Sequence, residues 1–222
     1  MKTFIPSSII ILVALFFMSG LAYADTKYPV GFGFEIGAEK ELPLNFDIGL
    51  FGEIHTCRTF NTLEHYCFIV HAGNMILPWL HAEVGYQFLD VQNAEDRDDL
   101  APGWNRMHRA FGGLEGTYTV KGFALGLRER YDYTSLVDNH ILRSRLHLEY
   151  DFQRAPIGLF ANVDMLNDLA SKFSIRQVFY RLGFEWQVAE HHTLELCGGF
   201  NQYDFQEEEC GFLIELGYEM SF

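Results

Sequence analysis

The residues best suited to chemistry form rows of charged side chains that recur at every second position. Arg128 and Arg130 form one row, and Arg143, Arg145 and His147 form another a few residues later. Side chains at i and i+2 of a β-strand lie on one face, so these rows predict charged faces on neighbouring strands. The set that we expect on one inner face is Arg109, Arg128, Arg130, Arg143, Arg145, His147, Glu149, Arg181 and Glu185.

So many cations on one face would repel each other unless carboxylates offset them. Carboxylates that the alternation places on the same inward face are available, namely Glu115, Asp132, Glu149, Asp151, Asp164 and Glu185. Two interpretations follow. Either the charges form an internal ion-pair network that fills and seals a narrow interior, or the arginines form a constriction that attracts anions.

Histidines on the same parity raise the question of a metal site. His55, His71 and His81 lie close in sequence to Glu53 and Glu83. A hairpin centred on Thr62 would set Glu53 opposite His71. The spacing matches no common zinc-ligand pattern, so we expect ordinary histidine–carboxylate pairs, with no metal ion and no other cofactor.

The four cysteines fall into two candidate disulfide pairs. Cys57 and Cys67 are symmetric about Thr62 and share inward parity, which predicts a cross-strand bridge. Cys197 and Cys210 flank the last hairpin, but the alternation puts them on opposite faces, so their pairing would need a bulge. An oxidising compartment outside the cytoplasm would permit both bridges.

No catalytic residues can be assigned. Ser144 lies on an apolar face between Leu142 and Leu146, and no histidine partner for it is evident. The acidic stretch from Glu95 to Asp99 lacks the glycine of a calcium-binding loop and is expected to be solvated.

The elements that would position these side chains are β-strands. Period-two alternation covers almost the whole chain, and the connections alternate between tight turns and longer polar loops. Eleven segments can be delimited, at 30–40, 44–58, 64–75, 79–91, 105–120, 122–133, 139–152, 156–165, 177–188, 193–204 and the last strand up to 222. Since single-chain bacterial barrels have even strand numbers, we expect 12 strands, with 10 as the alternative.

The apolar face of these strands could meet either a protein core or acyl chains. Aromatic residues collect beside the tight turns, as in the interfacial girdle of a membrane barrel. The chain also ends on a strand whose alternate residues are apolar, a pattern typical of the signal read by the barrel-assembly machinery: Phe212, Ile214, Leu216, Tyr218, Met220 and Phe222. We therefore expect an all-β, closed, antiparallel, up-and-down transmembrane barrel. In hydrocarbon the backbone N–H and C=O groups at an open sheet edge would have no hydrogen-bond partners, so the sheet must close on itself.

The first 24 residues indicate export. Lys2 is followed by an apolar run and by the Ala22-Tyr23-Ala24 cleavage pattern of a signal peptide. We expect residues 1–24 to be cleaved and residues 25–222 to form a single barrel domain. The net charge of −14 disfavours nucleic-acid binding and is compatible with lipopolysaccharide bridged by divalent cations.

Several short motifs resemble a family of outer-membrane β-barrels that is catalogued only as a domain of unknown function. They are Gly52-Glu53 with Arg58, Gly85-Tyr86, Arg128-Glu129-Arg130, Arg143-Ser144-Arg145, Arg181-Leu182-Gly183-Phe184 and the closing Phe222. The family's Arg-x-Arg-x-Glu order is only approximated. The resemblance implies a fold and a location but no activity.

Three functions follow from these observations. The first is a barrel in the outer membrane of a Gram-negative bacterium, surrounded by lipid and lipopolysaccharide, acting as a narrow small-solute channel or as a structural barrel with a charged lumen. The second is a membrane-embedded lipid-modifying enzyme, which the absence of an identifiable active site disfavours. The third is a secreted soluble β-sandwich that binds a ligand.

Overall fold

The computed structural model describes residues 30–57, 62–93, 103–135, 139–152, 155–170, 174–203 and 210–222. The expected signal peptide at 1–24, the first expected mature residue Asp25 and the acidic stretch at 95–99 lie outside these ranges. Within them, no helix is long and apolar enough to cross a membrane.

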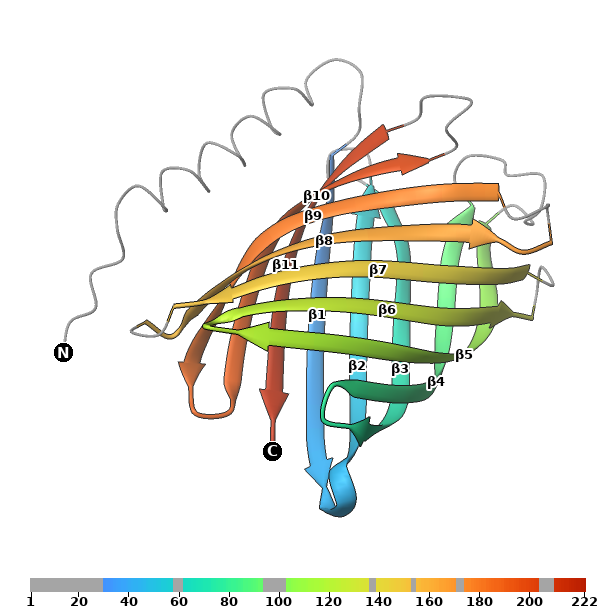
Figure 1. Cartoon of the computed structure of the whole chain (residues 1–222). Coiled ribbons are helices and arrows are strands. Elements are labelled where there is room, and N and C mark those ends of the chain that lie inside the picture. The colour runs from blue at the N-terminus through green and yellow to red at the C-terminus, as the bar shows by residue number, and fades with distance from the viewer. Residues whose placement is uncertain are drawn as a thin grey trace.

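The described residues form one closed β-barrel (Figure 1). Its strands are β1 (Val30–Leu42), β2 (Phe46–Cys57), β3 (Thr62–Leu77), β4 (Leu80–Asn93), β5 (Gly103–Val120), β6 (Phe123–Thr134), β7 (Asn139–Asp151), β8 (Ile157–Asp168), β9 (Ser174–Ala189), β10 (His192–Tyr203) and β11 (Cys210–Ser221). A single 3₁₀ turn, η1 (Pro43–Asn45), joins β1 to β2. Consecutive strands pair antiparallel throughout.

The barrel has 11 strands, so the expectation of 12 strands, with 10 as the alternative, is wrong. When an odd number of consecutive antiparallel strands closes into a barrel, the first and last strands run in the same direction and must pair parallel. Here β1 pairs parallel with β11 from Val30↔Phe212 to Glu39↔Ser221. Phe222 extends this seam, because its backbone N–H donates to Glu39 O and its carbonyl accepts from Glu41 N. The 11 segments delimited from the alternation correspond to the 11 strands; the even-number rule was the source of the error.

The outer face of the wall is apolar. Leu125 and Leu127 on β6 and Leu146 and Leu148 on β7 are about half exposed, and the register pairs Leu127 with Leu146 and Leu125 with Leu148. This sheet therefore presents a continuous aliphatic surface outward, on the side that the alternation assigned to it.

Exposed aromatic side chains lie at the rim that holds the tight turns and the C-terminus. Trp79 is 56% exposed beside the β3–β4 turn, and Tyr118 is 69% exposed near the β5–β6 turn. Trp186 and Phe222 are also exposed at this rim. Tyr66 and Trp104 are exposed and in ring contact near the opposite rim, so aromatic side chains flank the apolar surface at both ends.

The inner face combines charges with one apolar cluster. Cys67, Leu89 and Met107 are buried together on β3, β4 and β5, with Ile69 and Val91 packed against them. The remaining inward positions carry mainly charged residues, histidines and glycines, so the interior on the other strands is polar.

Candidate functional site in the barrel interior

The centre of the charged interior is a carboxylate held by two arginines. The β7–β8 register sets Arg145 opposite Asp164. Arg143 Nε and Arg145 Nε donate to Asp164 Oδ1 at 3.0 and 2.8 Å, and the side chain of Asp164 is completely buried. One carboxylate thereby offsets two guanidinium groups that would otherwise repel each other.

The arginines of β6 are also paired. Arg128 Nε donates to Glu83 Oε1 at 2.6 Å across the interior, and Arg130 Nε lies 2.8 Å from Asp132 Oδ1. The Arg130 guanidinium also stacks on the Phe111 ring, 4.5 Å from its centroid, a geometry that contributes a cation–π attraction.

The remaining arginines of the expected set have partners as well. Arg109 donates to Thr134 Oγ1 at 3.2 Å and to Gln87 Oε1 at 3.1 Å. Arg181 Nε lies 3.0 Å from Glu215 Oε2. All six arginines thus contact acceptors within the barrel: Arg109 contacts neutral side chains, and the other five contact carboxylates. This arrangement is that of an internal ion-pair network and does not support an anion-attracting constriction.

His147, Glu149 and Glu185 complete the expected set. His147 Nε2 lies 3.3 Å from Glu149 Oε2, and its Nδ1 hydrogen-bonds Asn162. Glu185 pairs in register with Glu195 on β10. The structure therefore places two acidic residues next to each other on the β9–β10 side of the interior.

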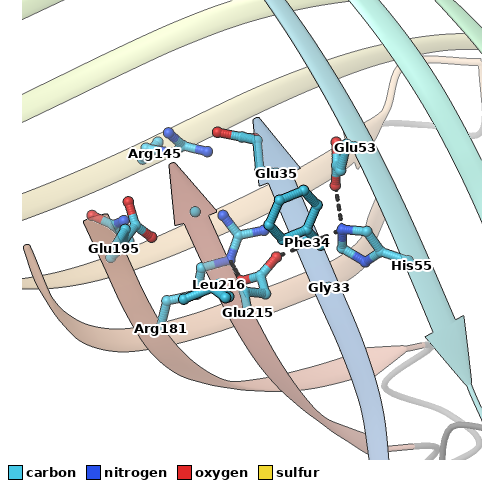
Figure 2. Close-up of a pocket in the computed structure, with 12 residues that line it drawn as sticks. Gly33, Phe34, Glu35, Glu53, His55, Arg145, Arg181, Glu195, Glu215 and Leu216 are labelled. Carbon is cyan, nitrogen blue, oxygen red and sulfur yellow. Dashed lines mark ion pairs between the residues drawn. The ribbon is translucent and has the colours of Figure 1, made fainter. Parts of the chain in front are cut away.

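A cavity of about 160 Å³ lies on this acidic side (Figure 2). Its walls come from β1, β2, β7, β8, β9, β10 and β11, and the charged or titratable residues that line it are Glu35, Glu53, His55, Arg145, Arg181, Glu195 and Glu215. Among these lining residues, four carboxylates face two guanidinium groups, so the cavity carries an excess of negative charge when the carboxylates are ionised and the histidine is neutral. A site of this kind favours cations.

Gly33 makes room for the side chains that meet at the closing seam. It pairs with His55 on β2 and with Glu215 on β11. A Cβ atom at this position would lie 2.9 Å from Glu215 Cγ and 3.2 Å from His55 Nε2. The missing side chain lets the imidazole and the carboxylate approach to 3.8 Å.

The histidines divide into two groups. His55 Nε2 contacts Glu53 Oε1, whereas His81 Nε2 contacts Asp47 Oδ2 at 2.8 Å and His71 Nδ1 lies 4.0 Å from Asp47 Oδ1. The expectation that Glu53 faces His71 is wrong, because the β2–β3 pairing is centred midway between 55 and 65 rather than on Thr62.

The sequence pattern did not single out several titratable residues of the interior, among them Glu35, Asp47, His65, Glu195 and Glu215. All five fall on the same strand face as their inward neighbours, which is the signal that could have identified them.

The disulfide expectations are also corrected. Cys67 and Cys197 are buried free thiols. The shifted register sets Glu53 opposite Cys67, and Cys67 Sγ donates to Glu53 Oε2 at 3.3 Å. Cys197 pairs with Glu215 in register and donates to its Oε2 at 3.2 Å, while Cys210 pairs with Gln202. Neither Cys57–Cys67 nor Cys197–Cys210 is bridged.

Ser144 lies on the outer face, as the alternation requires. It is opposite Glu129 on β6, and its hydroxyl donates to Glu129 Oε2 at 2.8 Å. This contact accounts for the single carboxylate on an otherwise apolar face of β6. The partner is a carboxylate rather than the imidazole of a serine hydrolase, so the contact gives no support to a lipid-modifying site.

The comparisons with known proteins identify no family. No family model matches the chain, and no curated protein matches it. Among solved structures it is similar to the KdgM porin, at 10% identity and a TM-score of 0.45, covering 77% of this chain and 89% of that one. It is also similar to the KdgM porin in complex with disordered oligogalacturonate, at 8% identity and a TM-score of 0.45, covering 80% and 92%.

The family of unknown function that the short motifs resembled is therefore not confirmed. What stands is the closed barrel. The likeness to the porin structures is too low to bear on function, so the function is inferred from the side chains of this chain.

Proposed function

We propose that this chain is an outer-membrane β-barrel whose interior forms a narrow, cation-favouring channel for small solutes. The observation that carries the proposal is the division of the wall: aliphatic and aromatic side chains are exposed outside, and ionised side chains are enclosed inside. Soluble proteins rarely expose contiguous apolar surface beyond a few hundred Å², whereas a membrane barrel requires it.

The route of export and assembly is part of the same proposal. A cleaved peptide at 1–24 would carry the chain out of the cytoplasm, and the closing apolar strand would be read by the barrel-assembly machinery. The outer-face residues of β11, from Phe212 to Phe222, lie on the lipid side of this arrangement. Lipid and lipopolysaccharide are then the surroundings of the barrel.

The preference for cations rests on the acidic cavity. Glu35 and Glu195 both line it, and the arginines nearby already contact carboxylates. Anions entering this side would meet net negative charge, so small cations and neutral solutes are the favoured occupants.

Conductance in planar lipid bilayers tests the proposal. Stepwise currents in a KCl gradient should show a reversal potential that favours K⁺ over Cl⁻. The double variant Glu35→Gln/Glu195→Gln should lose most of this preference, while Glu129→Gln, which removes a carboxylate from the outer face, should keep it. Anion preference, or an equal effect of Glu129→Gln, contradicts the acidic cavity as its source; the lack of any stepwise current leaves a structural barrel.

A further inference from the structure

Four side chains of ligand-forming types meet on the inner face of the β2–β3 hairpin. Glu53 and His55 are two residues apart on β2, and His65 and Cys67 are two residues apart on β3. The register pairs His55 with His65 and Glu53 with Cys67. Directly opposed residues have Cβ atoms about 4.5–5.5 Å apart, so the hairpin sets two imidazoles, a carboxylate and a thiol side by side.

Two imidazoles converge on one carboxylate oxygen. His55 Nε2 contacts Glu53 Oε1, and His65 Nε2 lies 3.9 Å from the same atom. The ligand atoms of Glu53, His55 and His65 all lie within 4.8 Å of one another. The two imidazole rings are stacked, with centroids 4.5 Å apart and planes at 20°, which keeps both Nε2 atoms on the side of the carboxylate.

We propose that Glu53, His55 and His65 bind a divalent transition-metal ion of the zinc type. Two imidazole nitrogens and one carboxylate oxygen are the protein ligands of open zinc sites. Bonds of about 2.0–2.1 Å in a tetrahedral site place ligand atoms about 3.3–3.4 Å apart. The 3.9 Å separation of His65 from Glu53 is within reach of that value by small side-chain rotations.

Neighbouring groups support the same assignment. Cys67 donates to Glu53 Oε2, the oxygen that does not face the histidines, and so orients the carboxylate. Glu215 Oε1, 3.8 Å from His55 Nε2, can supply a fourth ligand or hold a water molecule there. The side chains of His55, Glu53 and His65 are 9%, 20% and 21% exposed, so the site is shielded but open to the interior.

The chemistry of the ligands sets the metal class. Ca²⁺ and Mg²⁺ take oxygen ligands almost exclusively, whereas imidazole nitrogen favours zinc and its transition-metal neighbours. The Asp47, His71 and His81 group contains similar residue types, but its two histidines approach different oxygens of the aspartate. It therefore serves as a matched control. The inference does not require the barrel to conduct.

The test is a Zn²⁺ titration of the purified full-length barrel in detergent micelles after chelator treatment, read by competition with a chromogenic chelator. We expect one Zn²⁺ per chain and at least about a ten-fold loss of affinity in Glu53→Gln and His65→Gln, since even indirect support of a metal site is worth about 10–100-fold. His81→Gln should bind as the unaltered chain does, and excess Ca²⁺ should not compete.

Folding is checked for each variant by its shifted migration on unheated gels. His65→Gln changes a more exposed side chain than His55→Gln would, and Co²⁺ absorption in the unaltered protein provides a signature of the ligand set that needs no variant. Absence of Zn²⁺ binding to the unaltered barrel, a featureless Co²⁺ spectrum, or an equal loss in His81→Gln would overturn the proposal.

Discussion

Replacing Asp164 by asparagine should destabilise the barrel more than any other single removal of a charge. The substitution keeps the shape of the side chain but leaves Arg143 and Arg145 side by side without the carboxylate that now accepts from both. Asp164 is 0% exposed, so bulk water cannot replace the lost charge without opening the wall.

The magnitude follows from the two contacts. Hydrogen bonds to charged groups contribute about 1.5–3 kcal/mol each, and removing one partner of a buried ion pair costs about 3–5 kcal/mol. The two N–O distances of 3.0 and 2.8 Å are those of well-formed charge-assisted bonds. We therefore expect the free energy of unfolding to fall by about 3–5 kcal/mol in Asp164→Asn.

The assay is urea unfolding of the barrel in lipid vesicles, followed by the fluorescence of its three tryptophans. A double-mutant cycle with Arg145→Gln isolates the interaction. The double variant keeps the net charge of +1 that the unaltered Arg143, Arg145 and Asp164 group has, with fewer buried charges. The loss in the double variant should be smaller than the sum of the two single losses. A change below about 0.5 kcal/mol in Asp164→Asn, the range of ordinary surface substitutions, would refute the reasoning.

Three further predictions concern the wall, the thiols and the seam. Leu127→Arg places a charge in the middle of the apolar face and should cost about 2–4 kcal/mol in vesicles, whereas Tyr118→Arg near the rim should cost about 0–1 kcal/mol; equal costs would contradict immersion in a bilayer. Cys67 and Cys197 should both react with a maleimide in denatured, unreduced protein, as mass spectrometry of the peptides would show, and protection of either would contradict the free thiols. Deleting Phe222 removes two backbone hydrogen bonds to β1 together with the terminal aromatic, so outer-membrane levels of the protein on immunoblots should fall several-fold; unchanged levels would remove its role in assembly.

The alternation of residues predicted which side chains are inside and which are outside. Leu146 and Leu148 lie outside, Arg145 and His147 lie inside, and Ser144 falls on the outer face as its parity requires. The reason is that a period of two fixes the face of every residue in a strand whose one face is apolar.

The alternation could not predict which inward residues meet. A register shift by an even number of residues keeps every side chain on the same face of the sheet. The alternation therefore cannot distinguish a pairing of Glu53 with position 71 from the observed pairing with Cys67. The observed pairing separates the carboxylate from His71 and brings Cys67 to it, and it sets His65 beside His55. The contacts of Asp164 with two arginines likewise depended on a register that the sequence pattern leaves open.

The parallel pairing of β1 with β11 has a consequence for the two ends of the wall. Because both strands run in the same direction, Val30 begins at the rim opposite to the one where Ser221 ends, and the C-terminal end lies beside the tight turns (Figure 1). A circular permutant could not join these ends with a short linker. The connecting segment would have to cross the full height of the wall, so it would need to be about as long as one strand.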